Sequence, residues 1–278
     1  MVVDKNKLSI WLNRWDLIAD GNAFSTHTSQ LLPVKTVTTG LEAMLKVTDD
    51  TDEQTGHSLM EWWEGHGAAP VLAHENEAIL LARATGQRSL AAMSREGQDT
   101  EACRILCSVA NRLHGAQKKP WPQLTSLDEW FSPLVHITPK HSGMMAFCSE
   151  TAKELLSSPR DMVVLHGDLH HGNALDFASS GWLAIDPKGL SGERGFDFAN
   201  IFTNPDLDNP VPRVATVPER FKRRLKTVTE TAGLDKERLL KWIIAWCGLS
   251  AMWSFEDGIP HSTPLEVAKL AIDELEKS

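Results

Sequence analysis

The sequence predicts an α+β chain of two lobes, with a small β-rich lobe at residues 1–85 and a larger, mostly helical lobe at 86–278. Short apolar, β-branched runs separated by turn residues fill the first part, whereas apolar residues recur at helical spacing over most of the second. A polar, glycine-punctuated loop between two further strand-like runs interrupts the helical part. At 278 residues the chain is long enough for two cores.

The elements of the first lobe follow from local patterns. Tryptophans and leucines at 8–18 predict a short helix or an irregular lid, and the small, polar residues of 19–28 predict a loop between strands. Strand-like runs occupy 34–37 and 41–47 and are joined by a Thr-Thr-Gly turn. The second run carries Lys46, a lone lysine in an apolar strand. A helix at 52–65 and a buried strand at 78–82 complete the lobe.

The second lobe is predicted to be helical apart from its central loop. Apolar residues at a spacing of three and four, with glycine or proline beyond the last of them, indicate each helix. Near the end of the chain, Thr263 and Glu266 have the spacing of a capping box, with Pro264 at the first helical position. The helices are expected near residues 102–113, 127–131, 144–156, 218–232, 239–253 and 263–277.

The central loop carries the residues that indicate chemistry. A β-branched run, 162–165, leads into His-Gly-Asp-Leu-His-His-Gly-Asn, and a second run, 182–185, ends at an aspartate. A Ser-Ser-Gly turn is expected between the two runs, which would bring their polar ends together on adjacent strands. In protein kinases, one aspartate of such a loop accepts the proton of the substrate hydroxyl, and an asparagine and a later aspartate bind Mg²⁺. The corresponding residues here are Asp168, Asn173 and Asp186.

These residues carry a resemblance to a known family. The segment from His166 to Asn173, together with Ile-Asp-Pro at 185–187, resembles the two-part motif of the aminoglycoside phosphotransferases. The residues Gly-Trp-Leu-Ala-Ile-Asp-Pro-Lys-Gly-Leu at 181–190 resemble the streptomycin 6-phosphotransferase and hydroxyurea phosphotransferase branch. The resemblance implies a bilobal, protein-kinase-like fold, with ATP and Mg²⁺ bound between the lobes.

The resemblance also implies roles for single residues. Asp168 would be the catalytic base, Asn173 and Asp186 would hold Mg²⁺, and Lys46 would bind the nucleotide phosphates. The partner of that lysine would be a helix glutamate, but Gly56 stands at the expected position. Glu53, almost one turn earlier, is the best remaining partner.

Further roles concern the surroundings of these residues. His166 and Asp197 would support the catalytic loop, and Glu256 and Asp257 are candidates for contacting a cationic substrate. The loop 19–28 would cover the phosphates, although a plain hairpin turn explains it equally well. The strand at 78–82 would lie at the sheet edge and lead into the lobe boundary near residue 85.

Three alternatives remain open from the sequence. The acceptor could be hydroxyurea or another small metabolite, such as a choline-like alcohol or a sugar, instead of streptomycin or a related aminoglycoside. The single glycine in the phosphate loop and the displaced glutamate also suit an ATP-binding protein that no longer turns over. Finally, imidazole and carboxylate groups bind transition metals, so His166, His170 and His171 with Asp168 could form a metal cluster.

Composition narrows the class of protein. A hydrophobic fraction of 42% with 23% charged residues is typical of a globular chain. The formal net charge of −9 disfavours a nucleic-acid partner and suits a cationic substrate. Neither a leader-like start nor an apolar run of membrane-spanning length is present, so we expect a cytoplasmic protein. The oligomeric state is not predicted. The four cysteines lack metal-type spacing and are expected to be core residues: Cys103, Cys107, Cys148 and Cys247.

Overall fold

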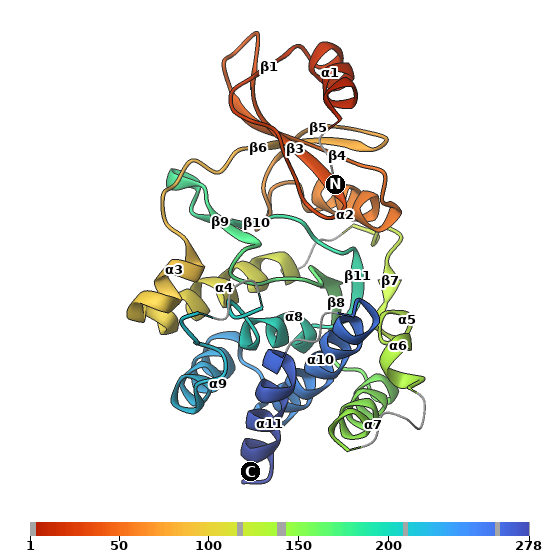
Figure 1. Ribbon diagram of the computed structural model, residues 1–278, viewed down its shortest axis with the longest axis vertical. Coiled ribbons are helices and arrows are strands. Elements are labelled where there is room, and N and C mark those ends of the chain that lie inside the picture. Colours follow the sequence, from red (N-terminus) through yellow and green to blue (C-terminus); the bar gives the residue numbers. More distant parts are fainter. Residues whose placement is uncertain (1–3, 116–118, 138–142, 208–210, 259–261, 278) are drawn as a thin grey trace.

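The computed structural model describes residues 4–115, 119–137, 143–207, 211–258 and 262–277. A β-sheet forms one end of the molecule and a group of helices forms the other, as Figure 1 shows. The fold is therefore the α+β arrangement that the sequence predicts, while the boundary between lobes near residue 85 stays a prediction. Among the described residues, no helix combines the length and the apolar character that crossing a membrane requires.

The N-terminal sheet is antiparallel, with strand order β1-β3-β4-β6-β5 and with β2 paired to β3. The strand at 78–82 is β6, which lies between β4 and β5. Its expected place at the sheet edge was therefore wrong, and β5 occupies that edge. The burial of four successive residues of β6 agrees with an interior strand. The strands are β1 (Leu17–Ala19), β2 (Phe24–Ser25), β3 (Ser29–Thr36), β4 (Glu42–Thr48), β5 (Val71–Glu75) and β6 (Ala78–Ala82).

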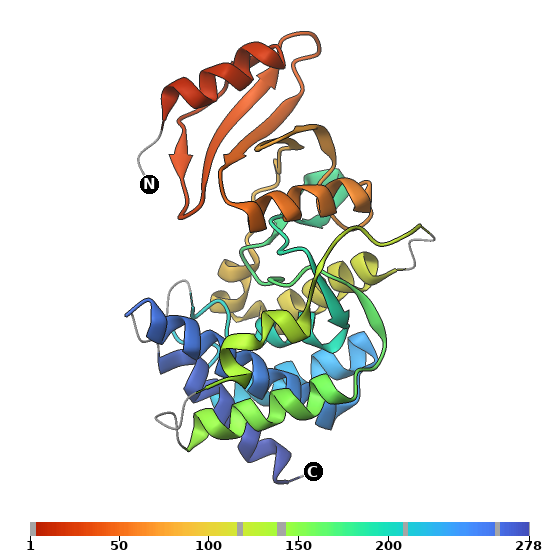
Figure 2. The same cartoon turned by 90° about the vertical axis from the view of Figure 1, so that its right-hand side faces the viewer.

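The alternation of side chains in β4 divides its residues between two environments. Leu45 and Val47 point to the face that is covered by helix α1 (Lys5–Arg14), where they form a small core with Leu8 and Trp11. Figure 2 shows α1 lying along this face. The intervening residue Lys46 faces the opposite side, toward the helical part of the chain. The period of two thus explains how a lysine occupies an otherwise apolar strand.

The helical part is built around α10 (Lys236–Glu256), which is buried on nearly all sides. Helices α7, α8 and α11 pack against it, and α9 packs against α4. Its predicted all-round burial is confirmed, and the four cysteines are buried and free, as expected. The remaining helices are α2 (Thr51–Trp63), α3 (Leu90–Met93), α4 (Asp99–His114), α5 (Leu127–Trp130), α6 (Ser132–Val135), α7 (Met144–Ser157), α8 (Gly195–Ala199), α9 (Pro218–Ala232) and α11 (Ser262–Leu275).

Two small sheets carry the central loop. In one, β8 (Met162–Leu165) pairs with β11 (Leu190–Glu193), which also pairs with β7 (Thr125–Ser126). In the other, β9 (Ala174–Asp176) forms a hairpin with β10 (Trp182–Ala184). The two predicted strands therefore belong to different sheets, and the turn at 179–181 joins β10 to β9 instead of to β8. The expected placement on adjacent strands was wrong because the short strand β9 had not been predicted.

Candidate active site

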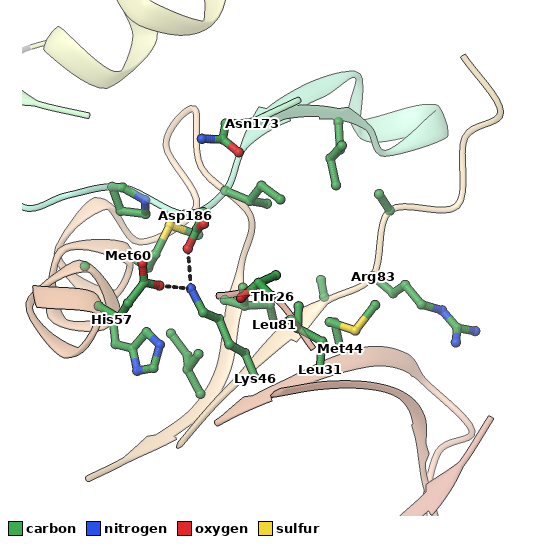
Figure 3. Close-up of a pocket in the computed structure, with 18 of the residues that line it drawn as sticks. Thr26, Leu31, Met44, Lys46, His57, Met60, Leu81, Arg83, Asn173 and Asp186 are labelled. Atoms are coloured by element: carbon green, nitrogen blue, oxygen red, sulfur yellow. Dashed lines mark hydrogen bonds and ion pairs between the residues drawn. The ribbon is translucent and has the colours of Figure 1, made fainter. Parts of the chain in front are cut away.

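A cavity of about 370 Å³ lies between the N-terminal sheet and the β9–β10 hairpin. Figure 3 shows Leu31, Met44 and Leu81 gathered on its sheet side, with Lys46 and Asp186 near α2. Leu175 and Phe177 contribute further apolar surface from the hairpin side. One part of the cavity is therefore suited to a flat apolar group and the other part to charged groups.

Lys46 lies at the centre of the charged part. Its ammonium group forms ion pairs with Glu53 and with Asp186, which are drawn as dashed lines in Figure 3. The Lys46 side chain is 10% exposed and that of Glu53 is 6% exposed. Burial would raise the pKa of Asp186, but the charge and hydrogen bond of Lys46 and the charge of Lys188 together lower it. The structure thus contains the ion pair between Lys46 and Glu53 that the sequence favoured.

Close packing explains why the glutamate lies at position 53 instead of position 56. Gly56 of α2 faces the backbone of Pro187, and a Cβ atom added at Gly56 would lie 2.2 Å from the Pro187 carbonyl oxygen. A glutamate cannot occupy that position. Glu53 lies in the first turn of the helix, where Asp50 caps the helix by accepting hydrogen bonds from backbone amides, including that of Glu53.

Two amide side chains orient the carboxylate of Asp168. Asn173 donates through Nδ2 to the Asp168 backbone carbonyl at 2.8 Å and to its Oδ2 atom at 3.2 Å. Asn200 donates through Nδ2 to Oδ1 at 2.8 Å. Since Nδ2 of Asn173 serves Asp168, its carbonyl oxygen is available to the cavity that this residue lines. Asn200 had not been singled out from the sequence.

The buried carboxylate of Asp197 binds the start of the central loop, ahead of Asp168. It accepts hydrogen bonds from the backbone N–H groups of His166 at 2.8 Å and Gly167 at 2.7 Å, and it contacts His114 Nε2 at 2.8 Å. Burial would raise the pKa of Asp197, but His114, His166 and the hydrogen bond from the Gly167 amide together lower it. Gly167 has φ of 84°, a conformation that glycine adopts without strain.

The histidines of the loop have structural partners or are buried. The Asp168 amide donates to His166 Nδ1 at 3.2 Å, so Nε2 carries the proton and donates to the Ile185 carbonyl at 2.8 Å. Burial lowers the pKa of His166 and that of His171. Within the described parts of the chain, no group of three or more histidine, cysteine or acidic side chains is arranged to hold a metal ion. The geometry therefore gives no support to the transition-metal cluster.

The other residues predicted from the sequence differ in whether they line the cavity. Phe24 and Thr26 line it, so the segment 19–28 reaches the site and also forms a hairpin through β2 and β3. Glu256 and Asp257 are exposed at the end of α10 and are not part of the cavity lining. Part of the loop that follows them, 259–261, lies outside the described residues.

Sequence reasoning also missed Lys188 as a member of the charged cluster. Lys188 Nζ lies 2.9 Å from Glu53 Oε1, while Lys46 binds the other carboxylate oxygen. Its position two residues after Asp186 was the available signal, but the ion pair joins residues 135 apart in the chain. Such a contact depends on how α2 packs against the segment after β10, which no local pattern describes.

Comparisons with known proteins agree with this geometry. Residues 14–258 match the model of a family described as aminoglycoside/hydroxyurea antibiotic resistance kinase. A streptomycin 3''-kinase of Klebsiella pneumoniae is 50% identical over 247 residues, covering 89% of this chain and 92% of the relative. A streptomycin 6-kinase of Streptomyces griseus is 33% identical over 273 residues, covering 92% of this chain and 85% of the relative.

A solved structure shows the same fold at low sequence identity. An amicoumacin kinase in complex with AMP-PNP, Ca²⁺ and its ligand superposes with a TM-score of 0.63 at 14% identity, covering 99% of this chain and 94% of that one. The fold is thus that of the small-molecule kinases, as the resemblance implied. Together with the family match over most of its length, this likeness shows that the chain belongs to the aminoglycoside/hydroxyurea antibiotic resistance kinases, a family of phosphotransferases.

Proposed function

We propose that the protein transfers the γ-phosphoryl group of ATP to a hydroxyl group of streptomycin, with Mg²⁺ as the metal. The observation that carries the proposal is the placement of Asp168, held by two amides, beside a cavity that ends in Lys46, Glu53 and Asp186. Phosphoryl transfer depends mainly on positioning and charge neutralisation, and this arrangement provides both.

The cavity divides naturally between the parts of a nucleotide. Its apolar portion, lined by Met44, Leu81 and Phe177, has the character that suits an adenine ring. Residues 82–84 line the same portion and would offer backbone groups to the base edge. Lys46 would bind the α and β phosphates, and Glu53 would keep its ammonium group in place. Phe24 and Thr26, from the β2–β3 hairpin, would lie over the phosphates.

The residues present fit a magnesium ion. Asp186, with a side chain that is 35% exposed, and the amide oxygen of Asn173 both face the cavity. They are hard oxygen ligands, and Mg²⁺ takes one or two such protein ligands beside phosphate oxygens and water. When bound, the ion neutralises charge on the β and γ phosphates. Lys46, which pairs with Asp186 in this structure, would then turn toward the phosphates.

In the proposed step, the phosphoryl group passes from ATP to the acceptor hydroxyl and the hydroxyl proton passes to the protein. The acceptor hydroxyl oxygen forms a bond to the γ-phosphorus while the bond between that phosphorus and the β,γ-bridging oxygen breaks, leaving ADP. The hydroxyl proton passes to the carboxylate of Asp168. Asn173 and Asn200 keep this carboxylate directed toward the acceptor by hydrogen bonds to both of its oxygens. Asp197 fixes the backbone from which Asp168 extends.

Relatives indicate the acceptor and its position. The streptomycin 3''-kinase shares 50% identity with this chain and the streptomycin 6-kinase 33%, so we propose the 3''-hydroxyl as the site of phosphorylation. The net charge of −9 favours the approach of a cationic aminoglycoside. We propose the cytoplasm as the compartment because ATP is available there. Glu256 and Asp257 remain candidate contacts for the acceptor.

The experiment is ADP release from Mg·ATP by the purified protein with streptomycin, other aminoglycosides, hydroxyurea and choline. Hydroxyurea is included because the family description names it. The proposal expects release that depends on streptomycin, with phosphorus coupled to the 3'' position in the NMR spectrum of the product. Release that depends on hydroxyurea, or nucleotide binding without release for any acceptor, would contradict it.

A further inference from the structure

Lys188 is fixed by its backbone between the catalytic loop and helix α2. Its N–H group donates to the His166 carbonyl at 2.8 Å, at the start of the loop that carries Asp168. The next residue, Gly189, has φ of 66°, and an added Cβ atom would lie 2.6 Å from Thr55 of α2. This segment therefore cannot move freely, and the Lys188 side chain starts from a defined position beside the site.

The Lys188 ammonium group is part of a charged network with four members. The carboxylate of Glu53 binds two ammonium groups, Lys188 through Oε1 and Lys46 through Oε2, and Lys46 also binds Asp186. Lys46 comes from the sheet, whereas Lys188 comes from the segment next to the catalytic loop. The Lys188 side chain is 26% exposed and that of Lys46 is 10% exposed. Lys188 is thus the more accessible of the two cations.

Carboxylates surround the Lys188 ammonium group. It is paired with Glu53, which also binds Lys46, the partner of Asp186, and the negative charges of Asp186 and Asp168 act on it as well. These three carboxylates belong to the phosphate end of the cavity and to the proposed base. Lys188 is therefore a cation within the charged group at one end of the cavity, on the segment that follows Asp186.

We propose that Lys188 is a further catalytic residue, whose ammonium group contacts the γ-phosphoryl group during its transfer from ATP to the acceptor. This inference rests on the proposed function of the same site. The flexible stem of a lysine allows Nζ to leave Glu53 for a phosphate oxygen while the backbone stays fixed. Lys46 would serve the α and β phosphates, so the two lysines would neutralise different parts of the nucleotide.

A purely structural role makes a different prediction. If Lys188 only holds Glu53 in place, its loss would disturb Lys46, and the affinities for di- and triphosphate nucleotides would fall together. If Lys188 contacts the γ-phosphoryl group, its loss would weaken the binding of a triphosphate and leave the binding of ADP unchanged. The ratio of the two affinities therefore separates the roles.

The test measures dissociation constants of Mg·ADP and Mg·AMP-PNP by calorimetry for the full chain and for K188M, with K46M for contrast. We expect K188M to bind AMP-PNP at least about tenfold more weakly, the loss typical of a hydrogen bond to a charged group, with ADP binding unchanged. In K46M, both affinities should fall. Equal losses for the two nucleotides in K188M, or no loss, would overturn the proposal.

Two further measurements make the result secure. The thermal midpoint of K188M is compared with that of the wild type to show that the variant is folded. If K188M does not fold, K188Q replaces it in the binding experiment, because glutamine keeps a polar contact to Glu53. Because no acceptor is present in the binding experiment, its result stands apart from the identity of the acceptor. A protein that fails to phosphorylate streptomycin would contradict the proposed function and leave the Lys188 test decisive.

Discussion

Gly56 offers a direct test of the packing that holds Glu53 near Lys46. In Gly56→Ala, the new Cβ atom would lie 2.2 Å from the Pro187 carbonyl oxygen, whereas unstrained carbon–oxygen contacts are about 3.3 Å or longer. Helix α2 or the segment of Pro187 must therefore move by about 1 Å. Both carry residues of the charged cluster, Glu53 on the helix and Asp186 next to Pro187.

Two opposing effects decide the sign of the stability change. An alanine in place of a helical glycine normally stabilises a protein by about 1 kcal/mol. Overpacking against a fixed backbone atom costs about 1–3 kcal/mol, and a contact this short belongs at the upper end of that range. We expect Gly56→Ala to lose about 2 kcal/mol net, which lowers the thermal midpoint by about 5 °C. A 1 Å displacement should reduce turnover by about a hundredfold.

The assay compares thermal unfolding and streptomycin-dependent ADP release for the wild type, Gly56→Ala and Ser58→Ala. Ser58 is exposed on the same helix, and its substitution should change stability by less than about 0.5 kcal/mol. A Gly56→Ala protein that is more stable than the wild type and fully active would refute the reasoning. That result would mean that α2 does not lie against Pro187 at this distance.

Three other substitutions test the roles of single buried residues. Asp197→Asn removes the charge that holds the catalytic loop and should lower the free energy of unfolding by about 3 kcal/mol, measured by urea titration. Asn200→Ala should lower kcat about tenfold or more without changing the KM for ATP, because the contact that it removes from the site is the one to the carboxylate of Asp168, while its other partners, Thr203 and Asn204, do not line the cavity. His57 has both ring nitrogens buried without a hydrogen-bond partner, and burial lowers its pKa to about 3. Below about pH 6.5, the unfolded chain therefore binds a proton at His57 that the folded chain does not bind. The free energy of unfolding consequently decreases as the pH is lowered. The free energy of unfolding is measured by urea titration at pH 7 and at pH 5. The wild type should lose about 2 kcal/mol more between the two pH values than His57→Leu, which has no imidazole at this position.

Local patterns predicted those features that depend on neighbours in the chain. The apolar run at 41–47 predicted the strand β4 that carries Lys46, and the spacing of Asp168, Asn173 and Asp186 indicated a phosphoryl-transfer site before any fold was known. Helices with strong periodicity and caps, such as α9 with Gly233 in the left-handed conformation at its end, were also predicted near their observed bounds. In each case a short stretch of the chain contains the whole signal.

Features that depend on packing between distant segments were not predictable in this way. The interior position of β6 follows from its pairing with both β4 and β5, and a single apolar run does not specify its partners. The contact of Gly56 with Pro187 explains the displaced Glu53, yet the two residues are far apart in sequence. The same is true of the pair formed by Lys188 and Glu53. Sequence patterns therefore indicated the class of reaction, and tertiary packing determined which further residues gather at the cavity.

The most direct test of the account is the transfer of labelled γ-phosphate from ATP to streptomycin by the wild type and by Asp168→Asn, with nucleotide binding measured in parallel. The account predicts labelled streptomycin from the wild type. For Asp168→Asn it predicts undiminished Mg·ADP binding and a loss of transfer of about a hundredfold or more, because the proton acceptor is absent. Transfer at the wild-type rate by Asp168→Asn would contradict the assignment of Asp168 as the base, and with it the proposed mechanism.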